Sequence, residues 1–495
     1  MRQYLFASFV IGIISFVSIR SSFYMTTDVA IKKNEILLYI GIMSSQNNFE
    51  ARQSIRDTWL KLAEQRDIKY AFLVGNEICS IPPEDRIYEE DCLEWIVDAT
   101  GSSEFSTAEI DLIPKKNPLE MELYIGFTFL VHHPIVIRSI NVQKDLVTAT
   151  TGLIRVSLIN SFSREKIVSA TFSSNENNSG PILLQKSVEP YVLPKGFEGQ
   201  ILVETINNKR KEITLNLSDC LLQWNNASGL ITFLQLIGNV NENPVSFHDR
   251  SCTFTSLSFS LHERGELQLH VANKDDRRKT WKNKTALLMK KLLKESEEKK
   301  DILFLDVIDV YRNLPRKLAQ FFKWAHLNAD STYVMKTDDD TFINVAEVTK
   351  NLKYAKKEQL YDMEGLHTYW WSSFREGWPV QSFGKWREDT YRSATYPPFP
   401  CGAGYVLSRD LIQFLGSSAF RFLYKGFQGE DVALGIWLAG VNPQRYPNDM
   451  FSCTWACDGT CNPQACNRVQ LSVDGMYESW HAFRNCSNFC GCQWT

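Results

Sequence analysis

Three consecutive carboxylates, Asp338–Asp340, are the residues of this sequence best suited to chemistry. They follow an apolar run that begins at Tyr333 and is typical of a short buried strand. Adjacent carboxylates raise one another's pKa, so a fold keeps three of them where a cation relieves the repulsion. Mg²⁺ and Mn²⁺ are such cations, and one or two carboxylates hold them together with the phosphates of a substrate. The alternative is an acidic turn exposed to solvent.

A second acidic pair, Glu430 and Asp431, follows Gly429 at the start of a predicted helix. The helix dipole favours a carboxylate in the first turn, so these acids are either a simple cap or part of an active site. The small residues of Cys401–Gly404 precede them and would let the backbone approach a ligand. The tryptophan-rich stretch 370–386 could add rings that stack on a sugar.

The elements predicted around the aspartates form strand–helix–strand units. A strand at 302–305 is followed by a helix that starts near Pro315, and the acidic strand comes next. Near the N-terminus a strand at 36–43, a helix at 49–66 and a strand at 70–74 repeat this order. In open α/β sheets, ligands bind beyond the carboxyl ends of the strands, which is where the aspartates are expected.

Residues 120–272 follow a different pattern, in which apolar and polar side chains alternate, as at Ile154, Val156 and Leu158. Short alternating segments separated by turn residues predict a β-sandwich. This region contains no cluster of catalytic residue types, which favours a structural role over the binding of a glycan or a partner. The first and last parts of the chain are therefore expected to form one α/β domain that a β-rich domain interrupts.

The 495 residues predict about two to four domains. A net charge of −3 argues against nucleic acid as a partner, because nucleic acid binding needs a basic face. An apolar run from Tyr4 to Ile19 is short for a membrane-spanning helix and long for the core of a cleaved signal. Since Arg20 occupies the place where a small-x-small cleavage site would be expected, an uncleaved signal anchor is favoured over a cleaved signal peptide.

The cysteines indicate an oxidising compartment. There are twelve, an even number, and eight of them lie between Cys401 and Cys492. The spacing of the last group would also allow a zinc site. After a secretory segment, disulfides are the favoured interpretation, although their pairing cannot be deduced from the sequence.

Taken together, these segments resemble the β-1,3-glycosyltransferases of glycosyltransferase family 31. The segments that carry the likeness occur in the family's order: 36–43, Asn48–Trp59, Tyr311–Pro315, Asp338–Asp340, Cys401–Gly404 and Gly429–Val432. A narrower likeness, to family members with a long insertion, covers most of residues 36–495. The region Asn225–Asp275 and the spacing of the terminal cysteines differ from those members. These differences bear on which acceptor is used more than on the reaction itself.

The resemblance implies a GT-A fold, an α/β Rossmann-like glycosyltransferase domain interrupted by a β-sandwich-like insertion and preceded by a signal anchor. The expected domains are residues 1–34 (cytoplasmic tail, signal anchor and short stem), 35–77 (first part of the GT-A domain), 78–284 (β-rich insertion) and 285–495 (second part of the GT-A domain, with a disulfide-rich C-terminus). It also implies a single-pass type II membrane protein of the Golgi or endoplasmic reticulum whose catalytic domain is lumenal.

The implied reaction transfers GalNAc from UDP-GalNAc to the 3-hydroxyl of a β-linked GlcNAc on O-mannosyl glycans of glycoproteins, with inversion and with Mn²⁺ (or Mg²⁺). Asp431 would be the general base and Glu430 its runner-up. Asp340 and Asp338 would bind the metal, with His481 as a third ligand. The residues assigned to the UDP-sugar donor are Arg52, Arg56, Asp338, Asp339, Gly402, Ala403 and Gly404.

Two other functions stay open at this point. The first is a β-1,3-galactosyltransferase or β-1,3-N-acetylglucosaminyltransferase of the same fold, since the motifs do not choose among UDP-sugars. The second, from another class, is an inactive glycan-binding protein resembling a lectin. Transfer of a sugar to an acceptor would distinguish the enzymes from the inactive glycan-binding protein. A screen of UDP-sugar donors would distinguish the enzymes from one another.

Overall fold

The computed structural model describes most of the chain after residue 35. The described ranges are 36–63, 67–98, 103–116, 126–149, 153–173, 183–206, 219–237, 245–246, 253–358, 368–417, 424–446 and 453–492. The predicted signal anchor at 4–19 lies outside these ranges. Among the helices that are described, none is long and apolar enough to cross a membrane.

A mixed seven-stranded sheet forms the centre of one body of the protein. In spatial order its strands are β15 (Ile302–Ile308), β2 (Ile68–Glu77), β1 (Ile36–Met43), β16 (Ser331–Asp338), β19 (Phe399–Ser408), β18 (Trp370–Arg375) and β20 (Arg445–Tyr446). The first four are parallel, whereas β19 runs antiparallel to β16. Strands from the two ends of the chain therefore pair in one sheet, as β1 does with β16.

Helices cover both faces of this sheet because its strands are apolar on both faces. On β1, Ile40 and Ile42 face one buried core, while Tyr39 and Met43 face the other. The first core is closed by α2 (Phe49–Asp57), α3 (Leu60–Ala63), α8 (Val345–Lys357) and α12 (Val473–Cys486). The second is closed by α7 (Leu314–Asn328), α9 (Arg409–Gly416) and α11 (Glu430–Leu438).

The helix predicted at 49–66 is divided into α2 and α3, and residues 64–66 lie outside the described ranges. The interruption falls at Thr58 and Trp59, both fully buried. The indole Nε1 of Trp59 donates to the carbonyl oxygen of Thr341, 3.1 Å away. This contact ties the end of α2 to the residue that directly follows the three aspartates.

Two antiparallel sheets form a second body around a core of their own. The six-stranded sheet consists of β13 (Val245–Ser246), β12 (Ile231–Ile237), β5 (Gly126–Val131), β10 (Glu198–Thr205), β7 (Leu153–Asn160) and β8 (Lys166–Ser173). The four-stranded sheet consists of β3 (Phe105–Ser106), β14 (Thr255–Leu261), β6 (Ile135–Gln143) and β9 (Leu183–Leu193). Alternate side chains such as Ile154, Val156 and Leu158 fill the shared core, which is the packing of a β-sandwich. We call this part the β-rich body and the first part the α/β body.

The remaining elements are short. They are η1 (Pro83–Asp85), β4 (Ala108–Lys116), α4 (Lys144–Ala149), β11 (Asp219–Trp224), η2 (Ala227–Gly229), η3 (Tyr311–Asn313), β17 (Phe342–Ile343) and β21 (Asn467–Arg468). Strands β4 and β11 pair with each other, as do β17 and β21.

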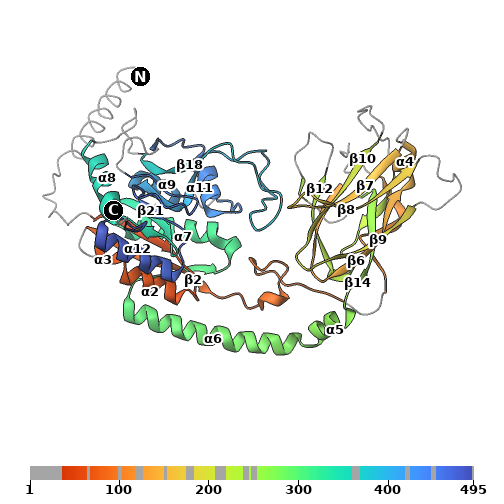
Figure 1. Cartoon of the computed structure of the whole chain (residues 1–495), viewed down its shortest axis with the longest axis horizontal. Coiled ribbons are helices and arrows are strands. Elements are labelled where there is room, and N and C mark those ends of the chain that lie inside the picture. The colour runs from red at the N-terminus through yellow and green to blue at the C-terminus, as the bar shows by residue number, and fades with distance from the viewer. Residues whose placement is uncertain are drawn as a thin grey trace, which may run out of the picture.

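A long polar helix joins the two bodies. After α5 (Arg264–Ala272), helix α6 runs without a break over Lys274–Lys299, and Leu292 is its only side chain among those described that is fully buried. Figure 1 shows α6 extending from α5, beside the β-rich body, to the neighbourhood of α2. A helix that is polar all round suits such a solvent-exposed bridge. The domain boundary predicted at 284/285 is therefore misplaced, because it falls inside a continuous helix that begins at Lys274.

The late cysteines form disulfides, as the sequence predicted. The described pairs are Cys79–Cys92, Cys401–Cys457, Cys453–Cys466, Cys461–Cys490 and Cys486–Cys492. The bond to Cys401 attaches the C-terminal segment to β19 directly before Gly402. This disulfide thus holds the C-terminal segment next to the predicted site.

Candidate active site

A cavity of about 490 Å³ lies at the carboxyl end of β16 and brings the two acidic clusters together. Asp338 and Asp340 line it from the end of β16, and Glu430 and Asp431 line it from the first turn of α11. Sequence analysis assigned these four carboxylates to one reaction although about 90 residues separate them. Their shared cavity is the geometry that the assignment requires.

A buried lysine that sequence analysis gave no role links the two clusters. The ammonium of Lys336 lies 2.7 Å from Asp338 Oδ1 and 2.9 Å from Glu430 Oε1, and it donates to the carbonyl oxygen of Gly402 at 2.6 Å. Its side chain has no exposed area. The cation satisfies both carboxylates, since an unpaired charge would be costly at such a depth.

The charges around Lys336 separate the pKa values of its two partners. Burial raises the pKa of Asp338 to about 7, against the opposing effect of Lys336 and with help from Glu430 and Asp340. Burial acts in the same direction on Glu430, but the Lys336 ammonium outweighs it and holds the pKa of Glu430 below its usual value. The side chain of Asp338 is 32% exposed, so it remains open to a ligand in the cavity.

Asp431 has the properties expected of a general base. Burial, and then the negative charge of Glu430, raise its pKa to about 6, which is close to physiological pH. The backbone N–H of Val432 donates to Asp431 Oδ1 at 2.8 Å. A Cβ atom on Gly402 would lie 3.4 Å from Oδ2, and one on Gly429, where φ is +89°, would lie 3.1 Å from Oδ1. The two glycines therefore leave room around this carboxylate.

Asp339 points away from the two acids that flank it. Its backbone N–H donates to the carbonyl oxygen of Met43, and its Oδ2 accepts from Asn48 Nδ2 at 2.9 Å. Burial raises the pKa of Asp339, while hydrogen bonds from Ser44 and Asn48 lower it. Asp339 therefore fixes the loop between β1 and α2 and is not among the residues that line the cavity.

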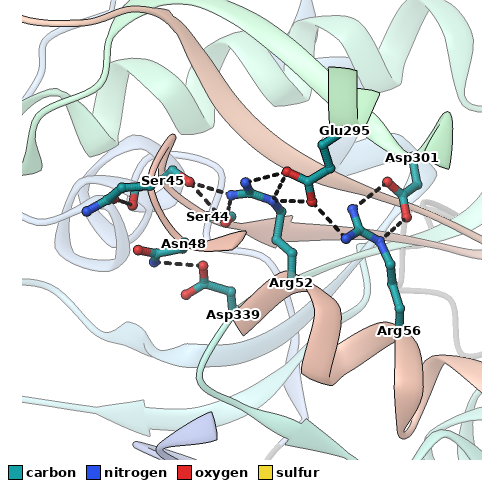
Figure 2. A network of polar contacts seen from close by, with 9 residues as sticks. Ser44, Ser45, Asn48, Arg52, Arg56, Glu295, Asp301 and Asp339 are labelled. Carbon is teal, nitrogen blue, oxygen red and sulfur yellow. Dashed lines mark hydrogen bonds and ion pairs between the residues drawn. The ribbon is translucent and has the colours of Figure 1, made fainter. Parts of the chain in front are cut away.

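The assignment of Arg52 and Arg56 to the donor is corrected by the structure (Figure 2). The side chain of Arg52 is fully buried and pairs with Glu295 at 2.7 Å, and Arg56 pairs with Glu295 and Asp301 at 2.7 Å each. Arg52 also donates to Ser44 Oγ at 2.9 Å. Carboxylates from α6 and from the segment that follows it already pair with both guanidinium groups, and neither arginine lines the cavity. Arg52 holds the loop before α2, whereas Arg56 ties α2 to Glu295 and Asp301.

Two of the three small residues on β19 line the cavity. These are Gly402 and Ala403, and the Ala403 carbonyl oxygen also accepts from Thr337 Oγ1 at 2.9 Å. Gly404 has a different role from the one predicted. A Cβ atom there would lie 2.7 Å from the ring of Trp455, so the glycine permits close packing of the C-terminal segment on β19 and does not line the cavity.

His481 is not where a metal ligand would be needed. It lies exposed on α12 and is absent from the lining of the cavity that holds the aspartates. The described ranges contain no group of three His, Cys, Asp or Glu side chains arranged to hold a metal ion. The prediction of His481 as a third ligand is therefore corrected: within the described residues, this cavity offers carboxylates alone.

The tryptophans of 370–386 divide into core and cavity residues. Trp370 and Trp371 are buried in the two cores that flank β18. Trp378 and Trp386 line the cavity and are 41% and 53% exposed. The guanidinium carbon of Arg375 lies over the Trp378 ring and the ammonium of Lys385 over the Trp386 ring, each 4.7 Å from the ring centre, so a sugar would stack on the other face of either ring. The indole Nε1 of Trp386 donates to the hydroxyl of Tyr311 at 2.8 Å. Tyr311 lines the same cavity; it belongs to a segment that carries the family likeness, but sequence analysis gave it no role in the site.

Comparison with known proteins gives the following matches. The family model described as galactosyltransferase matches residues 280–449. The UDP-GalNAc:beta-1,3-N-acetylgalactosaminyltransferase 2 of Danio rerio is 32% identical over 464 residues, which are 92% of this chain and 90% of that protein. The Homo sapiens protein of the same name is 30% identical over 474 residues, 92% of this chain and 89% of that protein. The beta-1,3-galactosyltransferase 6 of Mus musculus is 32% identical over 189 residues, 37% of this chain and 54% of that protein.

Proposed function

The chain belongs to the galactosyltransferase family of β-1,3-hexosyltransferases, and we therefore propose that it transfers GalNAc from UDP-GalNAc to the 3-hydroxyl of a β-linked GlcNAc. The acceptor would be a glycan on a glycoprotein, of the O-mannosyl type. The donor is inferred from the names of the relatives that match over 92% of the chain. The single observation that carries the mechanism is the cavity in which Asp431 and the aspartates of β16 meet.

Asp431 would act as the general base of an inverting displacement. The acceptor hydroxyl gives its proton to Asp431, its oxygen forms a bond to C1 of the donor sugar, and the bond from C1 to the UDP oxygen breaks. Asp431 Oδ1 already accepts from Val432, which leaves Oδ2, beside Gly402, to take the proton. Glu430 is the weaker candidate, since its ion pair with Lys336 lowers its pKa.

The carboxylates of the cavity fit Mn²⁺ or Mg²⁺ held jointly with a diphosphate. Such ions take one or two protein carboxylates and complete their coordination with phosphate and water oxygens. Asp340 and Asp338 both line the cavity and would supply these oxygens, without a third protein ligand among the described residues. When bound, the ion would neutralise the charge of the departing UDP. Gly402 and Ala403 remain the proposed backbone contacts of the donor.

The proposal for the cellular setting rests on the disulfides and the apolar N-terminal run. Five disulfides in the described residues agree with an oxidising compartment. We propose a Golgi or endoplasmic reticulum membrane protein of type II, anchored by residues 4–19. The β-rich body would then be an insertion in a GT-A domain, with both bodies in the lumen.

The purified full-length chain, in detergent with Mn²⁺, should transfer GalNAc from UDP-GalNAc to a β-GlcNAc acceptor. Parallel reactions with UDP-Gal and UDP-GlcNAc test the alternative donors. Faster transfer from either would replace the proposed donor and keep the reaction class. Glycan binding without turnover of any donor would instead favour the lectin-like alternative.

The reaction should lose rate in acid because its base must be deprotonated. The pKa of Asp431 is raised to about 6, so the fraction of ionised base falls as the pH falls through that value. We expect the acid limb of kcat/KM for the acceptor to lie near pH 6 in wild type. A limb near pH 4, typical of an unperturbed carboxyl, would contradict the role given to the buried Asp431.

Replacing Asp340 by alanine should weaken metal binding more than it disturbs the fold. Even outer-shell residues of metal sites cost roughly 10–100-fold in affinity, and we expect at least this loss for Mn²⁺ measured by titration in the presence of UDP. Asp474→Asn, on the exposed surface of α12, is the matched control. Unchanged Mn²⁺ affinity in Asp340→Ala would remove Asp340 from the site.

A further inference from the structure

A second cavity, of about 590 Å³, lies where the β-rich body meets the α/β body. One wall comes from the segment around η1 and includes Glu84 and Arg86. A second wall comes from the β-rich body and includes Lys195 and Glu198. The α/β body closes it with Arg312, Gly384 and Lys385. Its volume is within the range of about 300–1,000 Å³ that is common for small-ligand sites.

The second cavity shares a wall with the catalytic cavity. Tyr311 lines the catalytic cavity, and its neighbour Arg312 lines the second one. In the same way Trp386 lines the catalytic cavity and Lys385 the second. The hydrogen bond from Trp386 Nε1 to the Tyr311 hydroxyl joins the two pairs. One layer of side chains therefore separates the cavities, and the half-exposed ring of Trp386 stands between them.

The wall contains a polar group that the described residues leave unsatisfied. Arg312 Nε is buried and has no hydrogen-bond partner among them, while Nη1 makes long contacts of 3.3 Å to Gln428 Oε1 and 3.4 Å to the Arg387 carbonyl oxygen. Its guanidinium carbon lies 5.2 Å from the ring centre of Tyr88, which also lines the second cavity. Buried donors of this kind are normally paired, so the guanidinium of Arg312 has hydrogen-bonding capacity that its neighbours in the wall do not use.

The charges of the second cavity select the chemistry of its ligand. Its lining carries glutamates together with four cations, which are Arg86, Lys195, Arg312 and Lys385. A polyanion would meet the glutamates, which are Glu84, Glu89, Glu90 and Glu198. A chain of neutral hydroxyl groups, by contrast, can donate to the carboxylates and accept from the cations. This mixture therefore suits an uncharged oligosaccharide.

We propose that the second cavity is a subsite for the inner sugars of the acceptor glycan, which rests on the transferase function proposed above. The terminal sugar would occupy the catalytic cavity, and the chain behind it would cross Trp386 and bind between the two bodies. The β-rich body would thus select long acceptors.

The β-rich body also holds the loop that carries this wall. The backbone N–H of Gly384 donates to the carboxylate of Glu198 at 3.1 and 3.2 Å. The ring of Phe383 packs edge-on against Phe162, with 5.0 Å between their centres. Trp386 follows directly in the chain, so contacts with the β-rich body fix the ring that separates the cavities.

The test compares two acceptors with one donor in wild type and in Lys195→Ala. The short acceptor is p-nitrophenyl β-GlcNAc, and the long one is a trisaccharide with terminal β-GlcNAc. Wild type should have a higher kcat/KM for the trisaccharide. In Lys195→Ala, kcat/KM for the trisaccharide should be roughly 10-fold lower, which is the contribution of a hydrogen bond to a charged group. Its kcat/KM for the short acceptor should be unchanged. Lys166→Ala, another exposed lysine of the β-rich body but outside the cavity, should change neither.

Equilibrium titration of the same trisaccharide, without donor, keeps the two proposals separable. If wild type transfers GalNAc to neither acceptor, the proposed function fails, and the difference in trisaccharide affinity between wild type and Lys195→Ala still decides the subsite. If transfer occurs but both acceptors have equal kcat/KM, or the variant loses equally on both, the subsite is refuted and the transferase function stands.

Discussion

Asp431→Asn should lower the rate of sugar transfer by roughly 10²–10⁴-fold, the usual contribution of a general base. Asparagine keeps the shape of the side chain, and its carbonyl oxygen can still accept from the backbone N–H of Val432. It cannot take the proton of the acceptor hydroxyl. The affinity for UDP with Mn²⁺ should stay within a few-fold of wild type, because Asp338 and Asp340 are unchanged. Initial rates of UDP release at saturating acceptor, together with UDP titration, measure the two quantities.

The matched control is Asp410→Asn. Asp410 is also an acid in the first turn of a helix, α9, but it is exposed and lies outside the cavity. A helix cap alone contributes little to the rate, so this variant should keep nearly full activity. Equal and small losses in both variants would mean that Asp431 only caps α11. If Glu430→Gln carried the whole loss while Asp431→Asn did not, the base would be Glu430.

The meeting of the two acidic clusters could be predicted because both lie at ends of regular elements. Asp338 ends an apolar strand, and Asp431 lies in the first turn of a helix that follows a glycine. The order of strands and helices indicated an α/β sheet, in which such ends gather at one edge. The direction in which each side chain points could not be predicted from the sequence. Because successive residues of a strand point to opposite faces, Asp339 turns from the cavity and binds the loop at Asn48.

The same alternation could have revealed Lys336. A lysine two residues before Asp338 on one strand shares its face, and a charge inside an otherwise apolar strand needs a partner. The second partner, Glu430, could not be inferred in this way, since it lies on another element. The arginines show the same limit: Arg52 and Arg56 are close to the acidic strand in the fold, but their carboxylate partners are about 240 residues away in sequence. Nothing local distinguishes a structural ion pair from a ligand contact.

Lys336→Met should destabilise the α/β body by about 3 kcal/mol, the lower end of the range for breaking a buried ion pair. Methionine fills similar volume but leaves Asp338 and Glu430 without their cation. The lower end applies because Asp338 is partly exposed to the cavity and can be hydrated. At roughly 2–4 °C per kcal/mol, the melting temperature of this body should fall by about 6–12 °C. Lys350→Met, on the exposed surface of α8, is the control and should change it little.

The pH dependence of this loss separates an electrostatic cause from a packing defect. Without Lys336, both carboxylates have raised pKa values in the folded state, so the folded protein binds more protons than the unfolded chain. The free energy of unfolding of Lys336→Met should therefore approach that of wild type as the pH falls from 7.5 towards 5. Adding Glu430→Gln to Lys336→Met should recover part of the stability at pH 7.5, because one stranded charge is then removed. A loss that is the same at both pH values and in both variants would show that Lys336 acts through its volume, and the ion-pair bridge between the two acidic clusters would have to be abandoned.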